Sequence, residues 1–365
     1  MTERYEPGTR PRLRDSIVVA IGEDGRMQVR NPYERTVSTF DVEAWVPQVV
    51  SKMDGSKTAE ELGWAVAPAV PRGDVEAIID ALAEERLLAV SAPSRDVAGR
   101  HSRQLRLFDD MLASGDLIDA STSDGAQSIL RNSRVAVVGV GGAGSWVVQA
   151  LASAGVGNLD VIDADVVEVS NLNRQVLFRL EDVGSIKVEA ARRRVEQIDP
   201  SIRVTSRNRT IRTVAALREI IAGCDLVINC ADHPTVTLAS DIVAEACMAM
   251  GIPHIVGGAY GAVLGAPGVS VIPGETVCWF CVRATTADDD GGTQAQVIKS
   301  AGPAGSIAPI AGVVGSLTAW EAVRLLLGVS PTLSGSIREL DLSTLEWHVR
   351  AVQARESCRC VHAVL

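Results

Sequence analysis

The chain has 365 residues, a formal net charge of −10 and 47% hydrophobic residues, with only 4% aromatic. This length suits two domains of ordinary size. The acidic balance excludes a general affinity for nucleic acid or an anionic membrane, because both need clustered positive charge. The sequence shows no basic-plus-apolar signal at its start, and no uncharged apolar run reaches the roughly 20 residues that span a bilayer. We therefore expect a cytoplasmic protein.

The first part of the chain, residues 1–97, is predicted to form a small winged-helix-like α+β domain. A turn, "GEDG", separates two apolar stretches that alternate like paired strands. Thr58 and Glu61 have the spacing of a helix capping box. The predicted elements are strands at 16–21, 27–30 and 37–40, helices at 46–53, 59–67 and 74–85, and a strand at 86–90.

The second part, residues 98–365, follows a linker at 92–100 that has a proline and no apolar period. From Val135 onward, buried apolar runs alternate with amphipathic segments, which is typical of an α/β fold with a doubly wound, mostly parallel, Rossmann-like sheet. The predicted strands are 135–140, 159–163 and 224–232, and the predicted helices are 145–154 and 186–198.

A glycine-rich turn lies between the first of these strands and its helix. Gly139, Gly141 and Gly144 follow the strand and open the helix, an arrangement that brings phosphates to a helix N-terminus. Asp163 ends the next strand, where a carboxylate can bind a ribose hydroxyl. These features fit a nicotinamide-dependent dehydrogenase as well as any other nucleotide enzyme.

The residues that follow favour nucleotidyl transfer. The stretch "DADVVEVSNLNRQ" places Arg174 and several polar side chains just past Asp163, Lys187 begins the next helix, and Asp232 ends a later strand. A hydride-transfer reaction does not require this combination of arginine, lysine and aspartate side chains. Transfer of a nucleotidyl group needs cations to neutralise a triphosphate and a carboxylate to hold Mg²⁺.

The stretch from about Arg100 to the C-terminus resembles the ubiquitin-activating-enzyme superfamily in its bacterial form, the adenylyltransferases that activate sulfur-carrier proteins. The glycine turn, "D-x-D", "SNLNRQ" and "GSIKVEAA" occur in the family's order. The resemblance implies ATP and Mg²⁺ as cofactors and a homodimer in which Arg103 of "RHSRQ" acts in trans. It implies catalytic roles for Arg103, Arg174, Lys187 and Asp232. The implied nucleotide-binding residues are Gly139, Gly141, Gly142, Gly144, Asp163, Asp165, Ser170, Asn171, Asn173 and Gln175.

Two close cysteine pairs predict a structural zinc site. Cys278 and Cys281 have the usual spacing of a zinc half-site, and Cys358 with Cys360 supplies a second pair near the C-terminus. The resemblance implies that these four thiols close one Zn²⁺ site, with His362 as an alternative to Cys360. Two inert thiol pairs are the other interpretation.

The remaining cysteines favour direct use of an adenylate. Relatives that pass the acyl group to a thiol carry a cysteine in the loop before the final helix, and this chain has none between Val282 and Ser357. Cys224, Cys230 and Cys247 lie in predicted core elements, where a structural thiol is the better interpretation.

The N-terminal domain narrows the choice of substrate. Residues 36–90 contain ten acidic and four basic side chains, which disfavours DNA binding. An exposed edge strand can instead accept an extended peptide. The pattern resembles leader-peptide recognition domains of enzymes that modify ribosomally made peptides, and its fusion to an adenylation domain resembles microcin-type peptide adenylyltransferases. A structural dimerisation domain is the alternative.

The sequence is therefore compatible with three functions. The first is an ATP-dependent adenylyltransferase that binds a precursor peptide through residues 1–97 and activates it as an acyl- or peptidyl-adenylate. The second is activation of a ubiquitin-like sulfur carrier. The third is a non-catalytic scaffold that delivers leader peptide to a cyclodehydratase.

Overall fold

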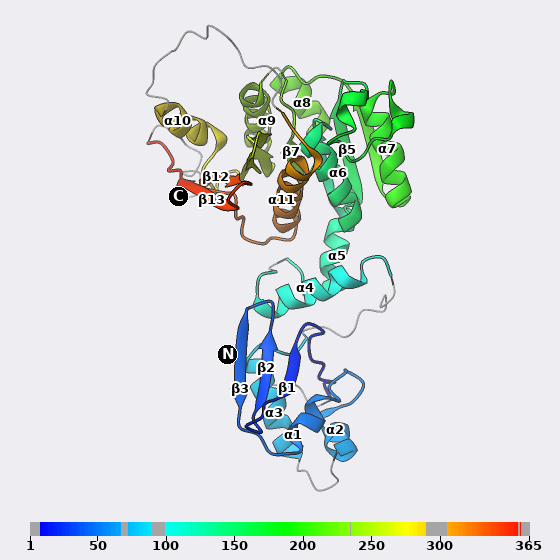
Figure 1. Ribbon diagram of the computed structural model, residues 1–365, viewed down its shortest axis with the longest axis vertical. Coiled ribbons are helices and arrows are strands. Elements are labelled where there is room, and N and C mark those ends of the chain that lie inside the picture. The colour runs from blue at the N-terminus through cyan, green and yellow to red at the C-terminus, as the bar shows by residue number, and fades with distance from the viewer. Residues whose placement is uncertain are drawn as a thin grey trace. The chain divides into compact units, whose positions relative to one another are not determined.

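The computed structural model describes residues 8–66, 72–89, 99–117, 119–233, 235–289, 305–356 and 358 (Figure 1). The chain divides into two compact units, Met1–Ser128 and Ile129–Leu365. The boundary expected from sequence, between residues 97 and 98, lies outside the described residues. Helix α4 (Ser102–Ser114) clusters with the N-terminal unit.

The N-terminal unit is a three-stranded antiparallel sheet covered by short helices. Val18–Ile21, Met27–Asn31 and Thr36–Phe40 pair in the order β1-β2-β3, so the sheet has β1 and β3 as its edges. The expected strand at 86–90 is reduced, within the described residues, to a single bridge between Leu13 and Leu88. The helices are α1 (Val46–Val50), α2 (Ala59–Val66) and α3 (Arg72–Glu84).

Local sequence signals explain these elements. The Thr58 Oγ1 atom accepts from the Glu61 amide at 3.2 Å, and Glu61 Oε2 accepts from the Thr58 amide at 2.8 Å, so the predicted capping box begins α2. The core of the unit is apolar and sits between the sheet and the helices. Its buried members are Met27, Val29, Val46, Val49, Val50, Met53, Leu62, Val75, Ile79, Leu82, Leu87 and Leu88.

The second unit is built on a six-stranded sheet in the order β11-β8-β7-β4-β5-β6. Five neighbouring strands are parallel, and β11 is an antiparallel edge. Valine and alanine follow Arg134 in β4 and are all buried, as expected of a strand buried on both faces. The strands are β4 (Arg134–Val138), β5 (Asn158–Asp163), β6 (Arg203–Asn208), β7 (Leu226–Asn229), β8 (His254–Val256) and β11 (Val269–Val271).

Helices cover both faces of this sheet, which confirms the predicted doubly wound α/β fold. Right-handed crossovers place α6 and α7 on one face and α8 and α9 on the other. Helix α11 packs along α6, and α8 packs on α9. The helices are α5 (Ser123–Asn132), α6 (Gly142–Ala154), α7 (Lys187–Ile198), α8 (Val214–Ile221), α9 (Val236–Met250), α10 (Trp279–Asp289) and α11 (Ala308–Leu326). Two short 3₁₀ turns, Val169–Asn171 and Leu180–Asp182, lie between β5 and α7.

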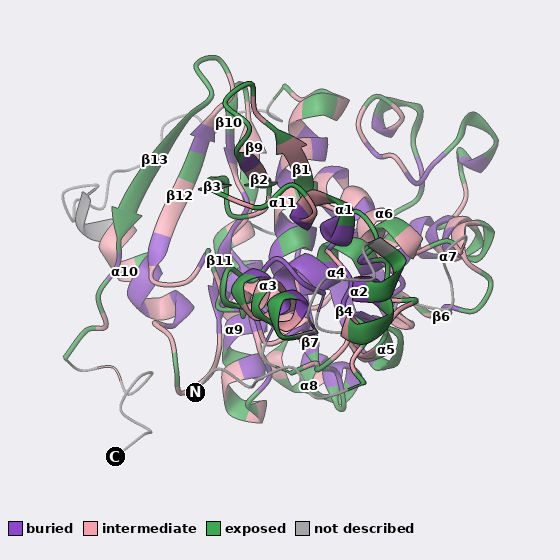
Figure 2. Cartoon of the chain, turned by 90° about the horizontal axis from the view of Figure 1, so that it is seen from below, coloured by how far each residue is buried: buried purple, intermediate pink, exposed green. Residues whose placement is uncertain are grey.

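A second sheet, which the sequence did not predict, lies in the same unit. It is antiparallel in the order β13-β12-β10-β9, and β13 is exposed along its whole length (Figure 2). Its strands are β9 (Ala259–Gly261), β10 (Leu264–Ala266), β12 (Ser336–Asp341) and β13 (Glu346–Ala351). Within the part of the chain that is described, no helix combines the length and hydropathy that crossing a bilayer requires.

Candidate nucleotide site

The largest group of predicted site residues meets in one cavity of about 760 Å³. It lies at the carboxyl ends of β4, β5 and β7, where the strand order reverses between β4 and β7, and this is the usual place for a ligand in such folds. Ten predicted residues line it: Gly139, Gly141, Gly142, Asp163, Asp165, Asn171, Arg174, Gln175, Lys187 and Asp232.

The glycines of the turn have different roles. Gly139 has a positive φ of 90°, and a Cβ on it would lie 2.6 Å from the Ala231 amide nitrogen, so the end of β7 leaves no room for a side chain. A Cβ on Gly144 would lie 2.1 Å from the carbonyl oxygen of Gly139. At Gly141, which precedes α6, a Cβ would meet nothing within 4 Å. Gly139 and Gly144 therefore close the turn, while Gly141 leaves it open to the cavity.

Asp163 is held by the backbone on both sides. Its Oδ2 atom accepts from the Val140 amide at 2.8 Å, and its Oδ1 atom accepts from the Asp165 amide at 2.8 Å. Each oxygen retains a lone pair for another donor. The carboxylate thus ties the glycine turn to the end of β5 and faces the cavity, which suits the predicted ribose contact.

The polar loop around Arg174 is fixed by its neighbours. The Arg174 Nη1 atom donates to the Ser170 carbonyl at 2.9 Å and to Asn173 Oδ1 at 3.0 Å. The indole of Trp146, on α6, donates to the Arg174 carbonyl at 3.0 Å. Ser145 Oγ accepts from the Val176 amide at 3.2 Å. The first turn of α6 therefore holds this cation at the cavity.

Lys187 is a buried cation that faces the cavity. Only 5% of the residue is exposed, and Nζ donates to Asp165 Oδ2 at 2.9 Å. The Asp165 side chain is 69% exposed, so the lysine is desolvated while its partner is not. Such an ammonium keeps a strong attraction for a second anion, because little water competes for it.

Asp232 supplies the cavity with a carboxylate. It lies just past β7, is exposed and lines the wall. Exposed carboxylate oxygens are the ligands that Mg²⁺ prefers, together with phosphate oxygens of the nucleotide. The residues present thus fit a magnesium nucleotide, with cations and carboxylate at one cavity.

Four predicted residues do not line the cavity. Gly144 shapes the turn from behind, and Ser170 and Asn173 contact Arg174. Asn173 Nδ2 also donates to the Ser306 carbonyl at 3.0 Å, at the start of the last helix. Arg103 belongs to the N-terminal unit, where it is exposed on the first turn of α4, and its action in trans remains a prediction.

The sequence did not point to several residues of the wall. Tyr260, from β9, reaches the glycine turn so closely that a Cβ on Gly142 would overlap its hydroxyl group. Arg209 adds a cation, and Ile211, Val236 and Ile242 add apolar surface suited to a base. No local motif marks these positions, because separate crossovers bring them to the sheet edge.

Three cysteines of the predicted zinc site come together. The Sγ atoms of Cys278, Cys281 and Cys358 all lie within 4.8 Å of one another. Cys278 Sγ is 3.9 Å from that of Cys281 and 3.6 Å from that of Cys358. Thiolates around one tetrahedral Zn²⁺ are about 3.8 Å apart, given Zn–S bonds of about 2.3 Å. The cluster fits the ion, while Cys360 and His362 lie outside the described residues.

The other cysteines behave as core residues. Burial raises the pKa of Cys224 and of Cys230 to about 12, and it raises the pKa of Cys247 as well. Cys230 lines the nucleotide cavity, but its thiol stays protonated near neutral pH and is a poor nucleophile. This agrees with the interpretation of these three as structural thiols.

A glycine turn, carboxylates and cations at one cavity of an α/β sheet are the features expected of a nucleotide-binding enzyme of the adenylyltransferase type. The chain belongs to the ThiF family, whose model matches residues 102–360. It is therefore an adenylyltransferase, and enzymes of this type use ATP with Mg²⁺.

Two relatives from Escherichia coli strain K12 share this part of the chain. The sulfur carrier protein ThiS adenylyltransferase is 32% identical over 71% of this chain and 93% of its own length. The molybdopterin-synthase adenylyltransferase is 35% identical over 64% and 88%, respectively. The resemblance to bacterial ubiquitin-activating-type adenylyltransferases is thus confirmed.

Solved structures match nearly the whole chain in fold. The structure of E. coli MccB with ATP has a TM-score of 0.76 at 21% identity and covers 96% of this chain and 99% of MccB. The structure of PaaA has a TM-score of 0.73 at 23% identity, covering 93% and 99%. The fold therefore extends beyond the ThiF part to the N-terminal unit.

Proposed function

We propose that this adenylyltransferase acts on a ribosomally made precursor peptide, which it binds through its N-terminal unit and activates as an acyl- or peptidyl-adenylate. The observation that carries the proposal is how much of the chain is covered by sequence similarity to carrier-activating relatives and how much by structural similarity to MccB. Carrier-activating relatives match 64% and 71% of the chain, whereas the fold of MccB matches 96%. A structure of MccB with the MccA peptide has the same fold, with a TM-score of 0.74.

The proposed peptide site is the outer edge of β3. This strand is an edge of its sheet, and Val37 is 62% exposed. The other edge strand, β1, lines a cavity together with residues 12–15 and Ile17 of the preceding segment. A free edge offers backbone donors and acceptors to an extended peptide, and alternate side chains give specificity.

In the proposed reaction, a carboxylate oxygen of the peptide attacks the α-phosphorus of ATP, the bond to the β-phosphate bridge breaks, and pyrophosphate leaves with the electron pair. A carboxylate is ionised at neutral pH and needs no base. The contribution of the chain is position and charge. Lys187 and Arg174 face the charge that grows on the phosphates, and the open turn at Gly141 admits the nucleotide close to the backbone.

Mg²⁺ would be held by Asp232 together with phosphate oxygens, where it supplies charge neutralisation. Asp163 would orient the ribose through the lone pairs that its two backbone contacts leave available. Arg103 would reach the site of a second copy from α4, so the active form would be a homodimer.

The test is ATP–pyrophosphate exchange by the purified chain with precursor peptides encoded beside its gene, and with a Gly-Gly sulfur carrier as the control. We expect exchange that depends on a peptide. Exchange with the carrier alone would replace this proposal with carrier activation. Peptide binding without any exchange would support the delivering scaffold and contradict adenylation of the peptide.

Carrier activation is the second candidate, and one observation favours it. The relatives that are 32% and 35% identical are named as adenylyltransferases for ThiS and for molybdopterin synthase. It leaves the N-terminal unit without a role, and for that reason we place it second.

The structural zinc site is a separate proposal. Zn²⁺ bound by Cys278, Cys281 and Cys358 would join α10 to the C-terminal segment, and Cys360 or His362 would complete the site. Metal analysis should find about one zinc per chain. Cys281→Ser should lose it, while Cys247→Ser, a buried thiol elsewhere in the core, should keep it. Equal zinc in both variants would contradict the site.

A further inference from the structure

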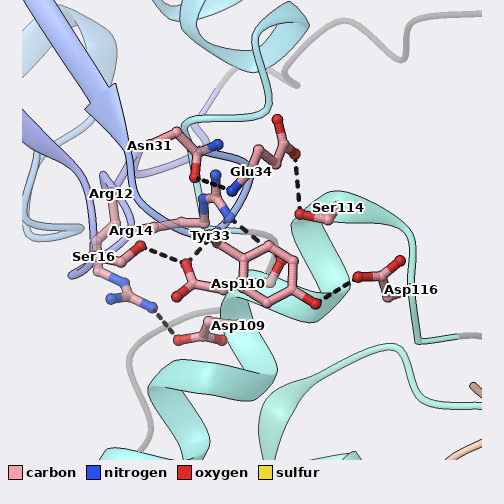
Figure 3. Close-up of polar contacts among 10 residues, drawn as sticks. All are labelled: Arg12, Arg14, Ser16, Asn31, Tyr33, Glu34, Asp109, Asp110, Ser114 and Asp116. Atoms are coloured by element: carbon pink, nitrogen blue, oxygen red, sulfur yellow. Dashed lines mark hydrogen bonds and ion pairs between the residues drawn. The ribbon is translucent and has the colours of Figure 1, made fainter. Parts of the chain in front are cut away.

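Helix α4 is fastened to the N-terminal sheet unit by buried charge (Figure 3). Arg12 Nη2 lies 2.9 Å from Asp109 Oδ2, and both side chains are only 10% exposed. Arg14, whose side chain is fully buried, donates through Nη1 to Asp110 Oδ1 at 3.1 Å and to the Asp110 carbonyl at 3.3 Å. Ser16 Oγ donates to Asp110 Oδ1 at 2.6 Å. Two adjacent residues of one helix are thus each paired with an arginine of the N-terminal segment.

The far end of the helix is fixed to the same unit. Arg86 Nη1 donates to the Ser114 carbonyl at 2.8 Å, and Ser114 Oγ donates to Glu34 Oε1 at 3.0 Å. Tyr33 Oη donates to Asp116 Oδ2 at 2.5 Å, just past the helix (Figure 3). Tyr33 and Glu34 lie in the turn between β2 and β3, so α4 is attached to the hairpin that carries the proposed peptide edge.

Arg103 is placed by this attachment. Residues 103 and 110 are seven apart in a continuous helix, so they lie on one face, about 10 Å apart along the axis. The first turn is also held, because Gln104 Nε2 donates to Gln127 Oε1, on α5, at 2.7 Å. A helix that is fixed at both ends can move its exposed arginine only together with the unit that holds it.

We propose that Asp109 and Asp110 are positioning residues: they make α4 an arm of the peptide-binding unit and thereby set the position of Arg103 at the nucleotide site of the second copy. This inference rests on the proposed function, which supplies both the peptide and the action in trans. In this proposal, the two buried ion pairs hold α4 in one orientation on the sheet unit. Peptide that binds beside β3 then acts on the same rigid body that presents the cation.

The test uses mixed dimers, made by coexpressing two differently tagged chains and measuring peptide-dependent pyrophosphate exchange. Arg103→Ala with Lys187→Ala is the reference pair. If Arg103 acts in trans, one site of this mixed dimer is complete and exchange returns. If the reference pair shows no exchange, Arg103 does not act in trans and the premise is wrong. That result is distinguishable from the outcome for Asp109→Asn, which is measured in other pairs.

Asp109→Asn, which keeps the side-chain size, should lower turnover about tenfold to a hundredfold, as expected for a displaced catalytic group. Its KM for ATP should stay unchanged. In a mixed dimer, Asp109→Asn should be rescued by a Lys187→Ala partner and not by an Arg103→Ala partner, because the chain with Asp109→Asn supplies a displaced Arg103 to the site of its partner. Rescue by an Arg103→Ala partner, or any other pattern, overturns the proposal. A variant that damaged the nucleotide site of its own chain would be rescued by the Arg103→Ala partner and not by the Lys187→Ala partner.

Two further variants guard against a simple loss of folding. Ser16→Ala removes one hydrogen bond to Asp110 without exposing a buried charge, and it should lower turnover in the same complementation pattern. Arg106→Ala is the matched control on α4, because its contact with Asp15 joins side chains that are 52% and 41% exposed. It should leave turnover as in the parent. An unchanged Ser16→Ala, or an equal loss in Arg106→Ala, would contradict a positioning role.

Discussion

The nucleotide cavity and the proposed peptide edge hold their functional groups in opposite ways. In the cavity, the backbone itself is constrained: Gly139 and Gly144 have no room for a Cβ, and Asp163 accepts from two amides. At β3, an edge of its sheet, three of the five residues are exposed and the other two are partly exposed. A site made by backbone geometry demands particular residues at fixed spacing, while a strand edge accepts many sequences.

This difference decides what could be predicted from the sequence. The glycine turn and Asp163 could be predicted because they have a fixed spacing within one strand-turn-helix-strand unit, whereas the role of Lys187 was implied by the family resemblance. Tyr260 and Arg209 could not, because β9 and the segment after β6 reach the cavity only through the folded topology. The fold class followed from apolar periodicity, which reports on burial along each element.

The N-terminal unit shows the same limit. Its three strands and the capping box of α2 were predictable from local patterns. The attachment of α4 was not, because Asp109 and Asp110 look like surface residues of an amphipathic helix. Only the fold brings Arg12 and Arg14 against them, and with those partners both carboxylates become buried.

The largest expected effect breaks the rigid side of the comparison. In Gly144→Ala, the new Cβ would lie 2.1 Å from the Gly139 carbonyl oxygen, so the turn must move by about an ångström. Such a displacement costs about a hundredfold or more in rate. Pyrophosphate exchange should fall accordingly. Gly141→Ala is the matched control for folding: it should unfold at the parent temperature and lose affinity for ATP only. Equal unfolding of both variants would contradict the assigned roles.

A second prediction concerns the sheet that carries the cavity. Burial lowers the pKa of His254 to about 4 from an ordinary 6.5, and the residue is fully buried in β8. The unfolded chain therefore binds a proton at a higher pH than the folded chain. The free energy of unfolding is therefore highest above pH 6.5, and it falls by about 3 kcal/mol as the pH approaches 4.

Denaturant unfolding of the second unit between pH 7 and pH 4 would measure this loss. His254→Asn cannot titrate, yet its amide can still donate to the Ile252 carbonyl, which the His254 Nδ1 atom contacts at 3.0 Å. Its unfolding free energy should depend less on pH than that of the parent. The same slope in both proteins would show that His254 does not carry the effect.

The smallest expected effect sharpens the open side of the comparison. Val37→Asp places a charge on the exposed edge of β3 and should weaken peptide binding about tenfold, equivalent to about 1.4 kcal/mol. Val18→Asp is the matched control on the opposite edge strand, where the native side chain is 50% exposed. Calorimetric titration of the peptide should distinguish them. Weaker binding in Val18→Asp alone would place the peptide at β1.

The central claim is a division of labour, with peptide binding in one unit and adenylation in the other. The direct measurement is the peptide dissociation constant of Lys187→Ala, taken beside its pyrophosphate exchange. Removing this buried cation should abolish exchange, by at least about a hundredfold, and leave the peptide dissociation constant at the parent value. Loss of peptide binding in parallel with exchange would contradict the claim.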